Sequence, residues 1–163
     1  MSRTTSPTAP TRPDRLDAEV VIPVRWDRLP AAEHAAEVEA MAGYLRGLSG
    51  LADVTVVDGS CPDRFAEHAR AWAPSARHVA PTGGTAVGVN GKVVGAMTGV
   101  LLARHERVVL ADDDVRYDRD TLTQVVRLLD DADLVRPQNV FSQWPWHARW
   151  DGARQARRPR SGR

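Results

Sequence analysis

Three consecutive aspartates, at the end of an apolar run, are the residues whose types and spacing most clearly suggest chemistry. Asp112, Asp113 and Asp114 follow directly after the run Val108–Ala111. We expect this run to be a strand buried on both faces of a parallel sheet, because such strands are apolar throughout. The carboxylates then lie at the C-terminal edge of the sheet, where open α/β sheets bind their ligands.

The spacing of these carboxylates suits a divalent cation. Side chains alternate along a strand, so Asp112 and Asp114 are expected on one side and Asp113 on the other. Mg²⁺ or Mn²⁺ prefers carboxylate oxygens and fills its other positions with water and phosphate oxygens. An acidic turn before a helix, with Asp120 as the N-cap, explains this stretch equally well.

A second acid and a lysine are expected near the same edge. Asp58 ends the apolar run Val54–Val57, and an Asp-Gly pair at that place is also typical of a plain turn. Lys92 lies near the start of a predicted helix, where it could meet an anion, although the surrounding residues fail the Walker pattern. The histidines outside the C-terminal region show no ligand spacing and are expected at surface or hydrogen-bonded positions: His34, His68, His78 and His105.

Strand-like and helix-like patterns alternate along the chain. Apolar or β-branched runs predict strands, and apolar residues at helical spacing predict helices. The expected strands are Val20–Arg25 with Pro23 near its end, Val54–Val57, Arg77–Pro81, the run from Val108 and Asp133–Val140; the expected helices are Ala31–Leu48, Asp63–Trp72, Asn90–His105 and Arg119–Asp130. This order predicts an α/β fold with a doubly wound, mostly parallel, Rossmann-like sheet and right-handed crossovers.

Composition predicts one soluble domain with two tails. The chain has 163 residues and a formal net charge of +1, so the total charge indicates neither nucleic acid nor membrane as a partner. A lone cysteine, Cys61, fits the reducing cytoplasm, and no apolar run is long enough to span a bilayer. Residues 1–17 and the basic residues 155–163 are expected to be disordered, which leaves residues 18–154 as the domain.

Four segments together carry a family resemblance. Val21–Arg25, Val56–Ser60, Asn90–Lys92 and Ala111–Asp114 resemble, in this order and spacing, the nucleotide-binding half of a family 2 glycosyltransferase with the GT-A fold. The later residues 135–139 and 144–151 are similar to an actinobacterial subgroup of these enzymes. The resemblance covers most of the predicted domain.

The resemblance implies a role for each matching residue. It implies that Pro23, Val24 and Arg25 border the base of a nucleoside-diphosphate sugar and that Asp58 contacts this base. Gly91 and Lys92 would flank the nucleotide. In the Asp-x-Asp motif, with Asp113 between its two acids, Asp112 would lie toward the ribose and share with Asp114 the binding of Mn²⁺ or Mg²⁺. The ion would neutralise the charge that develops on the leaving diphosphate.

The sequence departs from this family at its C-terminal end. Family members continue into an acceptor-binding half that carries the general base, whereas the residues after Arg154 are basic and lack large apolar side chains. We therefore expect a fold that is incomplete on its C-terminal side, a truncated chain of doubtful activity. Trp144, Trp146 and Trp150 are expected to have packed against the missing half, and they could mediate self-association. A sugar-stacking surface is the alternative for these tryptophans.

Three functions remain open at this point. The first is a glycosyltransferase that uses a nucleoside-diphosphate sugar and an unknown acceptor. The second is a catalytically inactive module that binds a nucleotide and a metal ion. The third is an unrelated doubly wound domain with an acidic Mg²⁺ site, such as a phosphotransferase, although no nucleophile or base is identifiable beside the aspartates.

Overall fold

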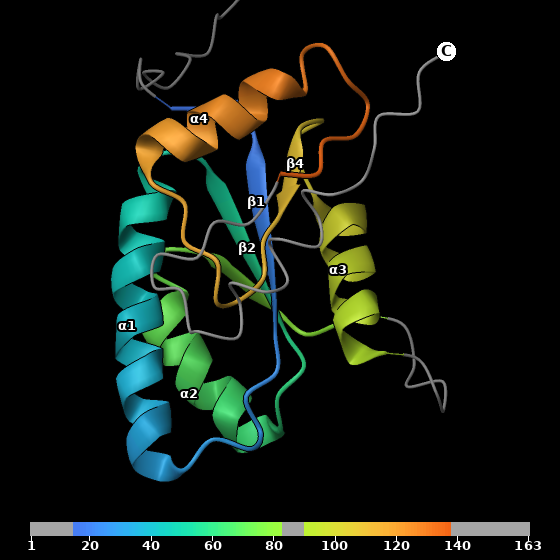
Figure 1. Ribbon diagram of the computed structural model, residues 1–163. Coiled ribbons are helices and arrows are strands. Elements are labelled where there is room, and N and C mark those ends of the chain that lie inside the picture. The colour runs from blue at the N-terminus through green and yellow to red at the C-terminus, as the bar shows by residue number, and fades with distance from the viewer. Residues whose placement is uncertain (1–14, 83–89, 138–163) are drawn as a thin grey trace, which may run out of the picture.

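A computed structural model describes residues 15–82 and 90–137 of the chain (Figure 1). Strands and helices alternate along these residues. The strands are β1 (Glu19–Val24), β2 (Asp53–Asp58), β3 (Arg77–Val79) and β4 (Val108–Leu110). The helices are α1 (Ala31–Ser49), α2 (Pro62–Trp72), α3 (Gly91–Leu102) and α4 (Arg119–Leu128).

All four strands form one parallel sheet in the order β3-β2-β1-β4. The sheet grows outward from β1 in one direction through β2 and β3 and then returns to add β4 on the other side. This reversal confirms the predicted doubly wound α/β architecture. The carboxyl ends of the strands point downward in Figure 1, toward the start of α1.

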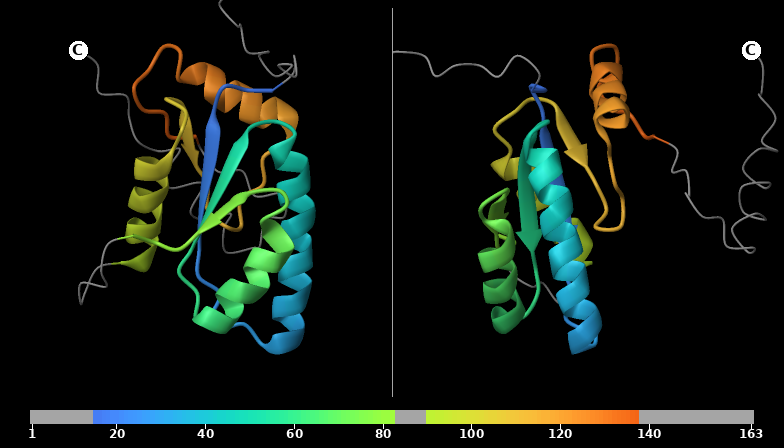
Figure 2. Two further views of the ribbon diagram at one scale, coloured as in Figure 1. Left: turned by 180° about the vertical axis from the view of Figure 1, so that it is seen from behind. Right: turned by 90° about the vertical axis from the view of Figure 1, so that its left-hand side faces the viewer.

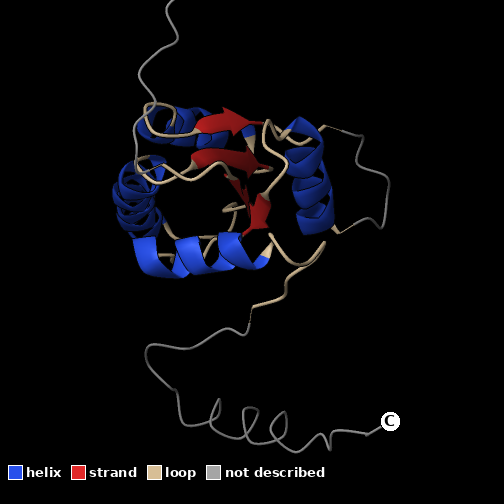
Figure 3. Ribbon diagram, turned by 90° about the horizontal axis from the view of Figure 1, so that it is seen from above, coloured by secondary structure: helices blue, strands red, loops and turns tan. Residues whose placement is uncertain are grey.

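The helices cover both faces of the sheet (Figures 2 and 3). Helices α1, α2 and α4 share one core with alternate residues of β1, such as Val20 and Ile22, and this core includes Met41, Leu45, Trp72, Leu122 and Val126. Helix α3 lies on the opposite face, against β1 and β2. The site at the carboxyl ends is therefore framed by helices from both sides.

Pro23 lies in the central strand, where proline is unusual because it cannot donate a ladder hydrogen bond. The amide of Glu19 donates to Arg107 on the β4 side, so by alternation the nitrogen of Pro23 also points to that side. The ladder with β4 ends at Val21, whose carbonyl accepts from the amide of Ala111. The missing N–H thus falls beyond the last paired residue, as expected from its place near the strand end.

The strand before the aspartates is not buried on both faces, and that prediction was wrong. In the sheet that the described residues form, β4 is an edge strand of three residues, in which Val109 is buried and Leu110 is 52% exposed. Val109 packs into the core shared with α1, whereas α3, within the described residues, packs mainly against β1 and β2. The apolar run alone could not reveal which strand lies at the edge.

The predicted strand Asp133–Val140 is also wrong as far as the structure describes it. Residues 133–137 form no strand, and residues 138–140 lie outside the described residues, as do Trp144 and Trp150.

The helices agree with prediction to within three residues at their ends, and Gly50 is the C-cap of α1. The N-cap of α4 is Asp118, two residues before Asp120, and its side chain accepts a hydrogen bond from the amide of Thr121.

The capping box of α4 gives a first testable prediction. The side chains of Asp118 and Thr121 satisfy each other's backbone amides at distances of 2.8 and 3.0 Å. We expect Asp118→Ala to lower the thermal midpoint by roughly 2 to 6 °C, because amides of the first turn lose their acceptor. Asp118→Asn should keep most of the midpoint, since asparagine caps about as well. Thermal unfolding followed by circular dichroism checks both; equal losses would contradict the capping role.

A charge network joins the opposite, amino-terminal edge of the sheet. Buried Glu19 accepts hydrogen bonds from Thr55, Arg77 and the amide of Arg104. Asp53 pairs with Arg15, Arg104 and His105. Residues 15–17, which the sequence analysis assigned to the N-terminal tail, lie against this edge, where the amide of Leu16 donates to the carbonyl of Leu51 at 2.7 Å.

His105 makes this network sensitive to pH. Its ring hydrogen-bonds to Asp53 at 2.9 Å and to Asp17 at 2.7 Å, and these bonds raise the pKa of His105 above its ordinary value of 6.5. A raised pKa in the folded state stabilises the fold fully below pH 6.5 and loses this contribution as the pH rises through the folded-state pKa.

We therefore expect the advantage of the wild type over His105→Gln to be largest near pH 6 and to shrink toward pH 9. Burial raises the pKa of Asp53, but hydrogen bonds from His105 and Arg15 outweigh burial and lower this pKa, so the carboxylate stays ionised over the range. Thermal midpoints of both proteins at several pH values check the prediction. A difference that is constant with pH would show that the His105 charge contributes nothing.

Candidate functional site

The acidic turn Asp112–Asp114 follows β4 at the carboxyl edge, as expected, but its side chains do not alternate as on a strand. β4 ends at Leu110, and the amide of Val115 donates to the carbonyl of Asp112 at 3.0 Å, which closes a turn. The reasoning from strand alternation therefore fails beyond Leu110. The position of each aspartate is set by its own partner.

Each aspartate of the turn has a different environment. Asp112 forms an ion pair with Lys92, with 2.8 Å between Oδ1 and Nζ. Asp113 accepts a hydrogen bond of 2.6 Å from the ring nitrogen Nε1 of Trp26. Asp114 is exposed and accepts no hydrogen bond from the described part of the chain. The turn is thus fixed on two sides and leaves one carboxylate free for a ligand.

Lys92 lies in the first turn of α3, where the sequence predicted a cation near the nucleotide. Asn90 is the N-cap of this helix, and its side chain accepts from the amide of Lys92 at 3.0 Å. The hydrogen bond with Asp112, followed by the charges of Asp113 and Asp114, raises the pKa of Lys92. The lysine stays protonated, and the N-terminus of α3 beside it adds further attraction for an anion.

The segment after β1 reaches the same edge. Arg25 is exposed, and its guanidinium pairs with Asp27 at 2.8 Å. It also approaches Gly91, since a Cβ on that glycine would lie 3.6 Å from a guanidinium nitrogen. Pro23 and Val24 are buried in β1 below this segment. The structure therefore brings Arg25, Gly91 and Lys92 together. Pro23 and Val24 precede Arg25 as the buried last residues of β1.

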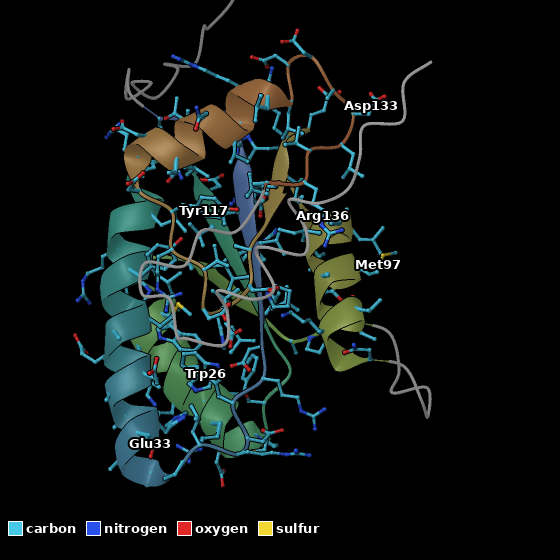
Figure 4. All side chains as sticks on the ribbon, in the orientation of Figure 1. Trp26, Glu33, Met97, Tyr117, Asp133 and Arg136 are labelled. Atoms are coloured by element: carbon cyan, nitrogen blue, oxygen red, sulfur yellow. The ribbon has the colours of Figure 1, made fainter. Side chains whose placement is uncertain are left out.

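Trp26 is a site residue that sequence reasoning missed. It lies beside α2 at the lower end of the sheet and is 8% exposed (Figure 4). Its backbone amide donates to the hydroxyl of Ser60 at 2.9 Å, while its ring donates to Asp113. Trp26 thus connects the loops after β1, β2 and β4. A tryptophan directly after the first strand was the only signal in the sequence.

Asp58 is held in a buried network rather than exposed at the edge. The carboxylate is 1% exposed and accepts hydrogen bonds from His68 Nδ1 at 2.6 Å, His78 Nε2 at 3.0 Å and the amide of Ser60 at 2.9 Å. Burial raises the pKa of Asp58, but these hydrogen bonds outweigh it and hold the pKa below its usual range. Its role as a base contact stays a prediction.

His34 and His68 occupy hydrogen-bonded positions, as expected, bonded to Glu67 and Asp58 respectively. Both are completely buried, however, and each leaves one ring nitrogen without a partner among the described atoms, Nδ1 and Nε2 respectively. His68 and His78 also come together with Asp58, with one ligand atom of each within 4.8 Å of the others. The residues lie 10 to 20 positions apart, so no local spacing could reveal this cluster.

Residues 67–137 match a family model described as glycosyl transferase family 21. This stretch of the chain is similar to a glycosyltransferase. The similarity supports a glycosyltransferase-like role, and the matched range includes Lys92 and the whole acidic turn. Comparison with curated proteins and with solved structures finds no match. Membership of family 2, the GT-A assignment and the actinobacterial subgroup stay predictions.

The acidic turn has the donors that Mg²⁺ or Mn²⁺ requires. Asp112 and Asp114 offer exposed carboxylate oxygens, the hard ligands that these ions prefer. Such ions fill their other positions with water and phosphate oxygens. The ammonium group of the neighbouring Lys92 pairs with Asp112, which shows that this carboxylate attracts a cation.

Among the helices of the described residues, none is long and apolar enough to cross a membrane.

Proposed function

We propose that the carboxyl edge of the sheet binds a nucleoside-diphosphate sugar together with Mn²⁺ or Mg²⁺, and that the protein transfers this sugar to an acceptor. One observation carries the proposal: the acidic turn after β4 lies against Lys92 at the start of α3, within a range similar to glycosyltransferases. Carboxylates beside a cationic helix N-terminus provide for a metal ion and a phosphate at one place.

In this proposal each residue of this edge has its own role in binding the donor. Asp112 and Asp114 would bind the cation, and the ion would supply charge neutralisation for the departing diphosphate. Lys92 and the first turn of α3 would attract the phosphates, so its present ion pair with Asp112 would be replaced. Arg25 extends the cationic side toward the segment after β1. Trp26 holds Asp113, which keeps the turn in position.

Turnover distinguishes this enzyme from a module that only binds. The protein is incubated with a panel of nucleoside-diphosphate sugars and Mn²⁺, and release of nucleoside diphosphate is measured, since many transferases hydrolyse the donor slowly when no acceptor is present. We expect release from one donor class, and none when EDTA removes the ion. Metal-dependent binding of a donor without any release would favour the inactive module instead.

A further inference from the structure

Asp58, His68 and His78 form a buried cluster outside the residues to which the proposed function assigns a role. The three residues come from the end of β2, from α2 and from β3, and their side chains are 0%, 0% and 2% exposed. One carboxylate oxygen and two imidazole nitrogens lie within 4.8 Å of one another. Three successive elements thus direct metal-binding atoms to one buried point.

Hydrogen bonds alone leave two buried nitrogens unsatisfied, one in His68 of this cluster and one in the neighbouring His34. His68 donates from Nδ1 to Asp58, so its Nε2 carries a lone pair. His34 donates from Nε2 to Glu67 at 3.1 Å, so its Nδ1 also carries a lone pair. Both atoms are buried without a partner among the described residues, and the two rings lie only 5.0 Å apart. Two neighbouring acceptors therefore have no donor between them.

We propose that this cluster binds a Zn²⁺-like divalent ion through Asp58 Oδ2, His68 Nδ1 and His78 Nε2. Each neutral histidine keeps one proton and only changes the ring nitrogen that carries it. For His68 the proton moves to Nε2, which becomes a donor beside the unpaired acceptor Nδ1 of His34. The two nitrogens form no hydrogen bond with each other here, but their rings are neighbours, so a small shift of the rings on metal binding would pair them and create an outer chain from His68 through His34 to Glu67.

The chemistry of the donors separates this site from the acidic turn. Two imidazoles and one carboxylate are a ligand set typical of Zn²⁺, whereas the turn offers only oxygens, which suit Mg²⁺ or Mn²⁺. Three protein ligands leave one position of a tetrahedral ion for water. The rings are already held in place, since His68 stacks on Trp72 at 4.2 Å and His78 packs on Phe65 at 4.4 Å.

Titration with Co²⁺ alone, followed by Zn²⁺ competition, tests this site in the full chain. Four-coordinate Co²⁺ has a strong visible absorption that Zn²⁺ abolishes on replacing it. We expect one equivalent of Co²⁺ to give this absorption and one equivalent of Zn²⁺ to remove it and raise the thermal midpoint. The signal should survive in Cys61→Ser and in the double variant Asp112→Asn/Asp114→Asn, because these change other possible ligands.

Two variants probe the ligands and the outer chain. His78→Gln should abolish the absorption, and His34→Phe should weaken Co²⁺ binding about 10- to 100-fold, because it removes only the acceptor behind His68. If His78→Gln fails to fold by circular dichroism, His34→Phe still decides. Absence of the absorption in the wild type, unchanged affinity in His34→Phe, or loss of the signal in the aspartate double variant would each overturn the proposal.

Discussion

Asp114→Asn is expected to abolish metal-dependent binding of a nucleoside diphosphate, weakening it by more than about 100-fold. Asp114 is the exposed carboxylate of the turn and accepts no hydrogen bond from the described residues, so it is the one most available to an ion. Asparagine keeps the shape of the side chain and removes its charge. Calorimetric titration of the diphosphate in the presence of Mn²⁺ measures the loss.

The two neighbouring aspartates provide the matched controls. Asp112→Asn should weaken binding less, because it removes a ligand but also frees Lys92 from its ion pair to meet phosphate. Asp113→Asn should remain close to wild type, since its side-chain oxygen can still accept from Trp26. Equal behaviour of the three variants would show that the ion is not held by this turn.

Gly99→Ala is expected to destabilise the fold by about 1–3 kcal/mol. A Cβ at this position would lie 2.1 Å from Cγ1 of Val21, so α3 would have to move away from the sheet. Alanine is the better helix former by about 1 kcal/mol, and the clash must exceed this gain. Urea unfolding at equilibrium measures the difference.

Gly47→Ala in α1 is the control for this substitution. A Cβ on Gly47 meets nothing within 4 Å, so only the gain in helix propensity remains. We expect it to be neutral or stabilising by up to about 1 kcal/mol. If both variants shifted the urea midpoint equally, the close contact between α3 and β1 would not exist in solution.

The sequence predicted where helices and strands lie along the chain better than it predicted how they pack against one another. Helical spacing and apolar runs located α1 to α4 and β1 to β4, because these signals come from residues close together in the chain. The strand order, the exposed face of Leu110 and the absence of a strand at residues 133–137 depend on contacts across the fold. An apolar run indicates that a strand packs somewhere, and it does not state on how many sides.

The candidate site shows the same division. The acidic turn and Lys92 could be predicted because each belongs to a short local pattern at the end or start of an element. The contact of Trp26 with Asp113, and that of Asp58 with His68, joins residues from different loops and elements. Pattern reasoning therefore found the groups of the proposed donor site and missed the contacts that hold them in place.

One measurement tests the central claim most directly: calorimetric titration of the wild-type protein with a panel of nucleoside diphosphates, with Mn²⁺ and with EDTA. Our account predicts that at least one nucleoside diphosphate binds with one-to-one stoichiometry in Mn²⁺ and that EDTA abolishes the binding. Binding of equal strength in Mn²⁺ and in EDTA, or no binding of any diphosphate under either condition, would contradict a metal-dependent donor site at the carboxyl edge of the sheet.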